Sequence, residues 1–261
     1  MAGGMAGLAT PALALTPDFL SKRGDLRIGL LANYPPFVFT RSGVPDTGIL
    51  PSIGKVLANE MWLAPSFIPL DVKSLEKYSY QEQFKRFGGL DIIMHVQSDS
   101  TQSRGFLHSR SYLEDQICFI SLPDIREIGL FPRTFHRKKV LAFPGQMVRE
   151  FMVNSPDAAK VDIDYGVTSE DLLSRAPLER MLIGEFEKFV ATRRQLEWML
   201  GNSAHKFHIN NIFFPDQNTR KDFCILVNPE SPWILEIIDR KILAMQRNYQ
   251  LHKIYQKYNL I

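Results

Sequence analysis

The chain of 261 residues is 45% hydrophobic and 23% charged, a composition typical of a globular protein with one large or two medium domains. Its 31 Lys and Arg stand against 28 Asp and Glu, and no stretch concentrates the basic residues, so nucleic-acid binding is not expected. No window of about 18 residues is both apolar and uncharged, so no membrane-spanning helix is predicted.

Residues 1–14 form a small, apolar and uncharged leader that ends in Ala12-Leu13-Ala14, a pattern that suits signal peptidase. The positively charged start of a complete secretory signal is missing. We interpret the leader as a signal-peptide remnant, with a flexible Ala/Gly leader as the alternative. The mature chain is then expected to begin near Leu15, outside the cytoplasm.

The first half of the chain alternates apolar segments of strand length with helical patterns. The predicted strands are Asp25–Leu31, Phe67–Leu70 and a segment from Asp91, and the predicted helices are Ile49–Glu60 and Ser79–Phe87. Pro35 and Pro36 end the first strand in a rigid turn, because proline continues neither a helix nor a sheet ladder. Strands that alternate with helices favour an α/β layer with a largely parallel sheet.

A second, smaller α/β unit is predicted after this layer. Its strands are Gln116–Leu122, Val140–Phe143, Val161–Tyr165 and Phe186–Ala191, and its helices are one from Gln146, Ser169–Leu182 and Arg193–Leu200. The chain closes with a strand at Phe223–Val227 and a helical region at Pro232–Tyr258 that breaks around Asn248.

The segment from Asp91 to Tyr112 carries the first functional signal. Its apolar strand runs into a polar elbow rich in Ser, Thr, Gln and Asp, and then reaches Arg104. Because a guanidinium offers a rigid bidentate fork to a carboxylate, this arrangement predicts a cradle for an anion. The alternative is an ordinary surface loop with a solvated Arg104.

Six segments together carry a resemblance to a known family. They are LRIGLLANYPPFVF (26–39), DTGILPSIGKVLA (46–58), GGLDIIMHVQSDSTQSR (88–104), KKVLAFPGQ (138–146), LIGEFEKFV (182–190) and the stretch from FCILVNPESPW to the end of KIYQKY (223–258). In this order and spacing the chain resembles family 3 of the bacterial extracellular solute-binding proteins. These proteins have the two-lobed type II periplasmic-binding fold and serve ABC importers of amino acids and related solutes.

The resemblance implies a discontinuous domain organisation. Residues 1–14 precede a first lobe made of 15–117 plus 225–261, and residues 118–224 form the second lobe. Gln116–Leu122 and Phe223–Val227 would be two crossover strands that act as a hinge when the lobes close. If the cysteines Cys118 and Cys224 lay on adjacent crossover strands, they could pair across this hinge. Neighbouring strands give poor disulfide geometry, so two free buried thiols are the preferred interpretation.

The resemblance also implies a ligand site in the first lobe. Arg104 matches the arginine that binds the ligand's α-carboxylate, and the assisting positions fall near Ser98, Ser100 and Thr101. Tyr34 or Phe37 matches the aromatic residue that lies over the ligand, although Tyr34 fits equally well as a structural turn residue. His95 replaces a small residue at the strand end, either in the pocket or, as we prefer, as a structural histidine. One residue more than in the family pattern separates Asp91 from Arg104.

The second lobe departs from the family pattern. Gly145, Gln146 and Met147 stand where amino-acid binders usually have Gly-Thr-Thr, which leaves the backbone N–H groups of a helix start as donors. The acid that usually receives the ligand's ammonium falls at or near Thr192. An ammonium without a carboxylate in a closed cleft carries a large desolvation penalty. We therefore expect a carboxylate or another anionic metabolite in preference to a free α-amino acid.

These observations predict a monomeric, non-catalytic solute-binding protein in the periplasm that delivers its ligand to an ABC permease in the inner membrane. No cofactor is expected. His205 and His208 have no third partner, so no metal site is predicted either. Two alternatives stay open: a dehydratase-like enzyme on the same fold, with His95, Asp99 or Glu114 as acid or base, and a ligand-sensing module that docks on a membrane partner.

Overall fold

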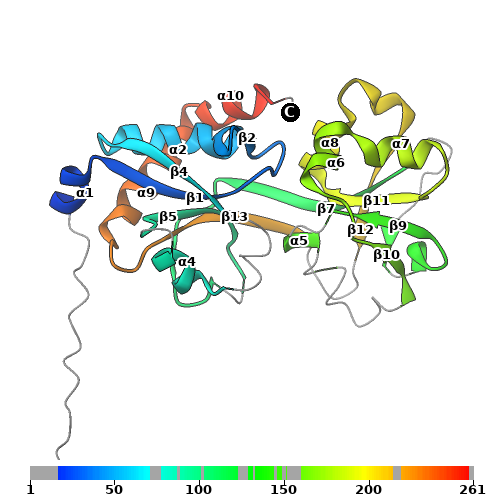
Figure 1. Cartoon of the computed structure of the whole chain (residues 1–261), viewed down its shortest axis with the longest axis horizontal. Coiled ribbons are helices and arrows are strands. Elements are labelled where there is room, and N and C mark those ends of the chain that lie inside the picture. The colour runs from blue at the N-terminus through cyan, green and yellow to red at the C-terminus, as the bar shows by residue number, and fades with distance from the viewer. Residues whose placement is uncertain are drawn as a thin grey trace, which may run out of the picture.

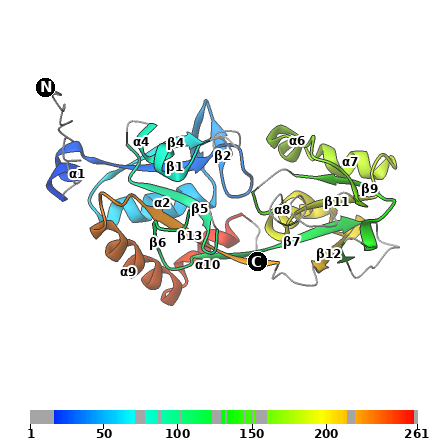
Figure 2. The ribbon, with the colours of Figure 1, turned by 90° about the horizontal axis from the view of Figure 1, so that it is seen from below.

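The computed structural model describes residues 17–70, 78–86, 89–100, 103–122, 129–131, 133–143, 146–148, 151, 160–213 and 219–258. The expected signal-peptide remnant and the site positions Thr101 and Gly145 lie outside these residues. Figures 1 and 2 show two bodies linked by two long strands. In the described part of the chain, eleven strands form one sheet that runs through both bodies.

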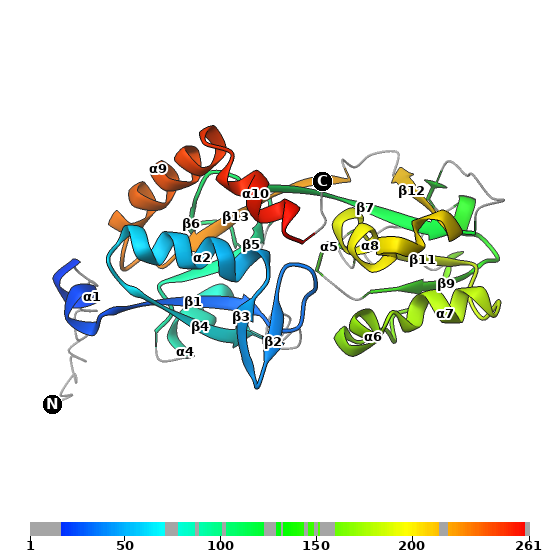
Figure 3. The same cartoon turned by 90° about the horizontal axis from the view of Figure 1, so that it is seen from above.

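The first lobe is built from the two ends of the chain. Its strands are β1 (Asp25–Leu31), β4 (Ala64–Leu70), β5 (Ile92–Gln97), β6 (Leu107–His108) and the hairpin of β2 (Phe39–Arg41) and β3 (Val44–Thr47). Its helices are α1 (Pro17–Arg23), α2 (Ile49–Glu60), α4 (Tyr80–Arg86), α9 (Trp233–Arg247) and α10 (Gln250–Gln256). β4, β1 and β5 are parallel neighbours. Figure 3 shows α2 over β1 and β4, with α9 and α10 beside it.

The second lobe repeats this plan. Its strands are β8 (Gly129–Leu130), β9 (Lys139–Ala142), β10 (Asp162–Asp164), β11 (Lys188–Thr192) and β12 (His208–Phe213). Its helices are α5 (Gln146–Val148), α6 (Ser169–Ser174), α7 (Ala176–Leu182) and α8 (Arg193–Leu200), with 3₁₀ helices at Arg133–Phe135 and Gly201–Lys206. β10, β9 and β11 are again parallel neighbours, and α7 and α8 pack on β11.

Two antiparallel strands connect the lobes. β7 (Leu113–Ser121) and β13 (Arg220–Val227) pair with each other only through their first halves, Leu113–Gln116 against Arg220–Phe223. Beyond this pairing, β7 continues beside β11 and β12, while β13 continues beside β5 and β6. The chain therefore crosses twice, which confirms the predicted two-lobed fold with two crossover strands. The expected lobe boundaries, 117/118 and 224/225, fall inside β7 and β13 and stay a prediction.

Most predicted elements are present with small shifts, and α2 and α8 have the predicted bounds. The helix predicted at 169–182 is divided into α6 and α7, because Arg175 between them has a left-handed conformation with φ of 61°. The strand β12 was not predicted.

The two cysteines lie far apart in the sheet. Cys118 is opposite Ala191 and Asn211 in the second lobe, whereas Cys224 is opposite Val96 in the first. Both are buried free thiols, and burial raises the pKa of each to about 12. The idea of a disulfide across the hinge is thus wrong, and the preferred interpretation as free thiols is confirmed.

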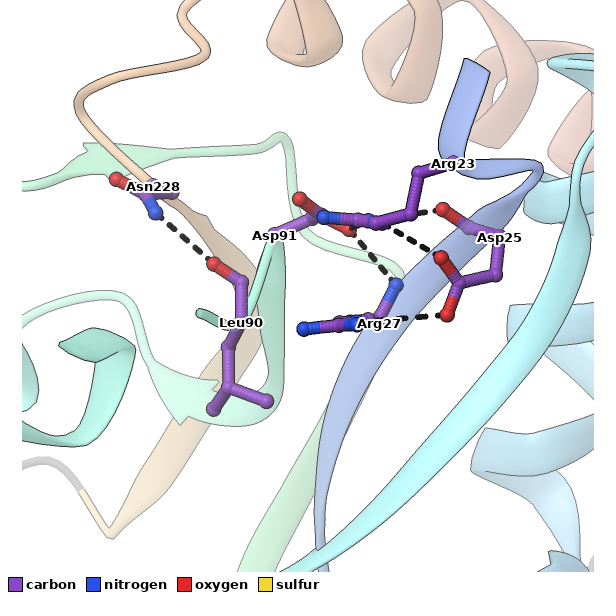
Figure 4. A network of polar contacts seen from close by, with 6 residues as sticks. All are labelled: Arg23, Asp25, Arg27, Leu90, Asp91 and Asn228. Carbon is purple, nitrogen blue, oxygen red and sulfur yellow. Dashed lines mark hydrogen bonds and ion pairs between the residues drawn. The ribbon is translucent and has the colours of Figure 1, made fainter. Parts of the chain in front are cut away.

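A buried carboxylate connects the start of β5 to α1 and β1 in the first lobe (Figure 4). Asp91, directly before β5, is fully buried and pairs with Arg23 at the end of α1. Its Oδ2 also accepts the backbone N–H of Arg27 on β1, at 2.7 Å. Nearby, the Asn228 amide donates to the carbonyl of Leu90, at 2.9 Å. Two chain segments from the N-terminal end and one from the C-terminal end are therefore joined at the start of β5.

Candidate functional site

Polar and aromatic side chains from both lobes converge where β5, β7, β11 and β13 meet. We call them the junction cluster. Its members are Tyr34 and Phe37 after β1, His95 and Gln97 on β5, Asp115 on β7, Phe143 after β9, Thr192 at the end of β11, Gln195 on α8, and Phe223 on β13. Apart from His95, all of them are buried.

A β-bulge places His95 in the cluster. Met94 pairs with Ile225 and Val96 pairs with Cys224, so His95 between them has no partner on β13. It has φ of 66°, and its backbone N–H donates to the hydroxyl of Tyr112 at 3.0 Å. A bulge adds one residue to one strand without changing its partner.

The His95 ring stands in an aromatic stack. It is nearly parallel to Phe223, with an interplanar angle of 7° and ring centroids 4.0 Å apart, and Phe37 lies at 4.5 Å. Tyr34 meets the ring edge-on at 5.3 Å. Neither ring nitrogen has a hydrogen-bond partner among the described residues. Burial lowers the pKa of His95 to about 3, so the ring is neutral at physiological pH.

Ring contacts join the two lobes around this stack. The ring centroids of Tyr34 in the first lobe and Phe143 in the second are 5.6 Å apart. The ring centroids of Phe39 on β2 and Trp198 on α8 are also 5.6 Å apart. Arg194 at the start of α8 stands over the ring of Tyr255 on α10, at 5.2 Å. The lobes therefore touch each other, and the junction cluster lies between them.

Asp115 is the charged member of the cluster. It is 4% exposed, and its Oδ1 accepts the backbone N–H groups of Gln116 at 2.8 Å and Arg194 at 3.3 Å. Burial raises the pKa of Asp115 to about 6, although the Thr192 hydroxyl, these N–H groups and the Arg194 charge lower it. The other oxygen, Oδ2, has no hydrogen-bond partner among the described residues.

Further polar atoms in the cluster also lack hydrogen-bond partners. In the described part of the chain these are both amide atoms of Gln97, Oγ1 of Thr192 and Nε2 of Gln195. The Thr192 hydroxyl is close enough to affect the pKa of Asp115, but it forms no hydrogen bond of good geometry. A buried polar group without a partner costs roughly 1–3 kcal/mol, and natural proteins contain few of them. Such a concentration is typical of a site that a ligand completes.

The structure brings together some of the predicted site residues. Tyr34, Phe37 and His95 are in direct ring contact, and Thr192 lies beside Asp115 on the other side of the cluster. Met147 is buried on α5, which lies where the lobes meet (Figures 1 and 3).

The segment after β5 lies at the edge of the cluster. The backbone N–H of Ser98 donates to Asp222 of β13 at 2.9 Å, and Ser100 is buried and accepts from Ser103. Arg104 is exposed, and its side chain has no hydrogen bond or ion pair with any described residue. No contact places Arg104 in the junction cluster, so its role stays a prediction. Gln146 begins α5.

Sequence reasoning missed Asp115, Gln97, Gln195, Phe143 and Phe223. A signal existed for Asp115, because alternation along β7 puts it on the same face as the apolar Leu113 and Ile117. For Gln97 the only signal is its place at the end of an apolar strand.

Tyr112→Phe is expected to lower the free energy of unfolding by roughly 1–3 kcal/mol, because the buried N–H of His95 loses its acceptor. Urea denaturation would measure this change. Tyr249→Phe is the matched control, because Tyr249 is 70% exposed and its substitution should change stability by less than about 0.5 kcal/mol. Equal effects of the two substitutions would contradict this role of Tyr112.

Asp115→Asn is expected to stabilise the unliganded protein at pH 8 and to have little effect near pH 4. A folded-state pKa raised from 3.8 to about 6 makes the ionised carboxylate unfavourable in the folded protein, by about 3 kcal/mol. The favourable contribution of the protonated form is present below about pH 4 and is lost as the pH rises through about 6. Thermal unfolding of both proteins across this range would measure it, and a pH-independent difference would contradict it.

Comparisons with known proteins place the fold in a class. The architecture is that of the two-lobed substrate-binding proteins of amino-acid ABC transporters, as predicted. One solved structure of this kind is the substrate-binding protein AbpA from Streptococcus pneumoniae bound to L-arginine. It has a TM-score of 0.70 and 15% identity, over 92% of this chain and 97% of that one.

Two further solved structures have the same fold. The P235GK mutant of ArgBP from T. maritima has a TM-score of 0.66 and 16% identity, over 93% of this chain and 98% of that one. The ancestral amino-acid-binding protein AncCDT-1, described as a precursor of cyclohexadienyl dehydratase, has a TM-score of 0.66 and 18% identity over the same shares. No family model and no curated protein matches the sequence.

Proposed function

We propose that this protein is a periplasmic solute-binding protein that captures a small carboxylate-bearing or amino-acid-like solute between its lobes. The observation that carries the proposal is the junction cluster, which contains several buried polar atoms without hydrogen-bond partners among the described residues, close to the two crossover strands. A solute with complementary donors and acceptors would satisfy these atoms and hold the lobes together. Closure around a solute is the usual work of a two-strand hinge.

Arg104 is our candidate for the carboxylate of the solute. Its exposed guanidinium has no ion pair among the described residues, so it is available to a ligand. Ser98, Ser100 and Thr101 would assist it from the same segment. Tyr34 and Phe37 would supply aromatic surface, and Gly145, Gln146 and Met147 would face the solute from the second lobe.

A role in transport is supported by solved structures with this fold that are substrate-binding proteins of amino-acid ABC transporters. We propose an ABC permease in the inner membrane as the partner and a monomer as the working form. No helix in the described residues has the length and apolar character needed to cross a membrane. Nor do three or more His, Cys, Asp or Glu gather there in a way that could hold a metal ion.

Binding is favoured over catalysis by the state of the three residues considered as acid or base. His95 is enclosed by aromatic rings, and burial lowers its pKa to about 3. Asp99 pairs with Lys221 at 2.5 Å, and Glu114 is exposed beside Arg220 at 3.7 Å. Asp99 and Glu114 are therefore engaged with basic side chains, and the enclosed ring of His95 has no hydrogen-bond partner among the described residues. We therefore propose a protein that binds its solute without changing it.

A thermal-shift screen tests this function. The panel holds the standard amino acids, di- and polyamines, and mono- and dicarboxylates, each added to the whole protein. A solute at a hundredfold its dissociation constant is expected to add about 2.7 kcal/mol to the free energy of unfolding. NMR of the recovered solute should show it unchanged. A panel without any stabilising member would contradict solute binding, and a converted solute would favour the enzyme.

A further inference from the structure

The carboxylate of Asp115 is the least satisfied charge in the junction cluster. It lies on the crossover strand β7, close to Thr192 and Arg194 of the second lobe, and it is only 4% exposed. Its Oδ1 is used by two backbone N–H groups, whereas Oδ2 is without a hydrogen bond among the described residues. A buried carboxylate oxygen rarely lacks both a hydrogen bond and an ion pair, because no other interaction then replaces its lost hydration.

Two cationic side chains around Asp115, those of Lys221 and Arg194, make other contacts. Lys221 is directly opposite Asp115 in the β7–β13 pairing, on the same face of the sheet, but its Nζ pairs with Asp99 at 2.5 Å. Arg194 contributes a favourable charge, yet its Nε donates to the carbonyl of Glu114 at 3.1 Å and its guanidinium stands over Tyr255. Within the described residues no side chain forms an ion pair with Asp115.

The polar groups near Asp115 include acceptors suited to a donor-rich cation. The Thr192 hydroxyl lies beside the Asp115 carboxylate, and its oxygen can accept from such a group. The aromatic faces of Tyr34 and Phe37 are on the first-lobe side. An ammonium or guanidinium group would find there a carboxylate, neutral acceptors and π-surface, which together are the usual surroundings of a bound cation.

We propose that Asp115 binds a cationic nitrogen group of the solute, an ammonium or a guanidinium, through its Oδ2. This inference rests on the proposed function and narrows the solute to the amine-bearing class, amino acids included. It also changes the expectation drawn from the sequence, in which the lack of an acid at Thr192 argued against a free amino acid. Asp115, from the crossover strand, supplies a carboxylate beside that position.

Asp115→Asn is the decisive variant. The amide keeps an oxygen that can accept from Gln116 and Arg194, so the structural role of Oδ1 survives while the charge is removed. Glu114→Gln is the matched control, because Glu114 is the neighbouring residue on the opposite, exposed face of β7. Thermal unfolding without solute verifies that both variants fold.

Isothermal titration with a matched set of probes gives the readout. L-Arginine, agmatine and 5-guanidinopentanoate differ by the loss of the carboxylate or of the α-ammonium, and L-glutamine and glutaramate form a second pair. Any stabilising solute from the thermal-shift panel is added to the set with its amine-free analogue. We expect an amine-bearing member to bind most tightly. Asp115→Asn should weaken this member at least tenfold, while Glu114→Gln leaves it within twofold.

Two results would overturn the inference while leaving solute binding intact. One is that a carboxylate without any cationic nitrogen group, such as glutaramate, binds most tightly, and the other is that Asp115→Asn binds the cationic probe as well as the unaltered protein does. If no probe and no panel member binds the unaltered protein, the proposed function fails, and the role of Asp115 fails with it.

Discussion

Arg104→Ala is expected to weaken the binding of carboxylate-bearing solutes by roughly 30- to 5000-fold. Removal of one partner from a hydrogen-bonded charge pair costs about 2–5 kcal/mol, since the other charge loses its counterpart. Isothermal titration with the solutes found by the thermal-shift screen would measure the loss. Arg104→Lys should give an intermediate affinity, because lysine keeps the charge but not the bidentate fork.

Arg110→Ala is the control for this experiment. Arg110 belongs to the same segment and its side chain is exposed, while its backbone N–H is bound to Asp239 at 2.7 Å and is unaffected by the substitution. The Arg110→Ala variant should bind each solute with the affinity of the unaltered protein. If Arg104→Ala also bound every solute normally, the carboxylate site would have to be placed elsewhere.

Asp91→Ala is expected to lower the free energy of unfolding by roughly 3–5 kcal/mol. The substitution leaves the guanidinium of Arg23 and the N–H of Arg27 without their shared acceptor at the start of β5. Urea denaturation would measure the loss. Asp25 also pairs with Arg23 and Arg27, but its side chain is 24% exposed, so Asp25→Ala should cost only about 1 kcal/mol. A larger loss for Asp25→Ala would contradict this ranking.

The parts of the fold that the sequence predicts are those with a local signal. α2 begins after Gly48 and carries Pro51 in its first turn, and the apolar pattern of Ile49–Glu60 has helical spacing, so its bounds are recovered. β12 has no such signal. It contains Asn210, whose amide donates to Ser121 of β7 at 3.0 Å, and it becomes a strand through this pairing with a distant part of the chain.

The same division applies to the candidate site: residues with a local sequence pattern were predicted, and residues placed by distant contacts were not. Tyr34 and Phe37 stand beside two prolines, a pattern that is visible in the sequence. Asp115 was not recognised, because a carboxylate in a strand is usually exposed and only the packing of α8 against β7 encloses this one. The bulge at His95 depends on how β5 aligns with β13, which no local pattern determines.

The ring contacts between the lobes have a consequence for the speed of capture. Tyr34 with Phe143 and Phe39 with Trp198 hold the two bodies together around the junction cluster. If these pairs close the way to Asp115, a solute binds there only while they are apart. The frequency of their separation therefore sets a ceiling on uptake, so the observed association rate should level off at high solute concentration instead of rising in proportion to it.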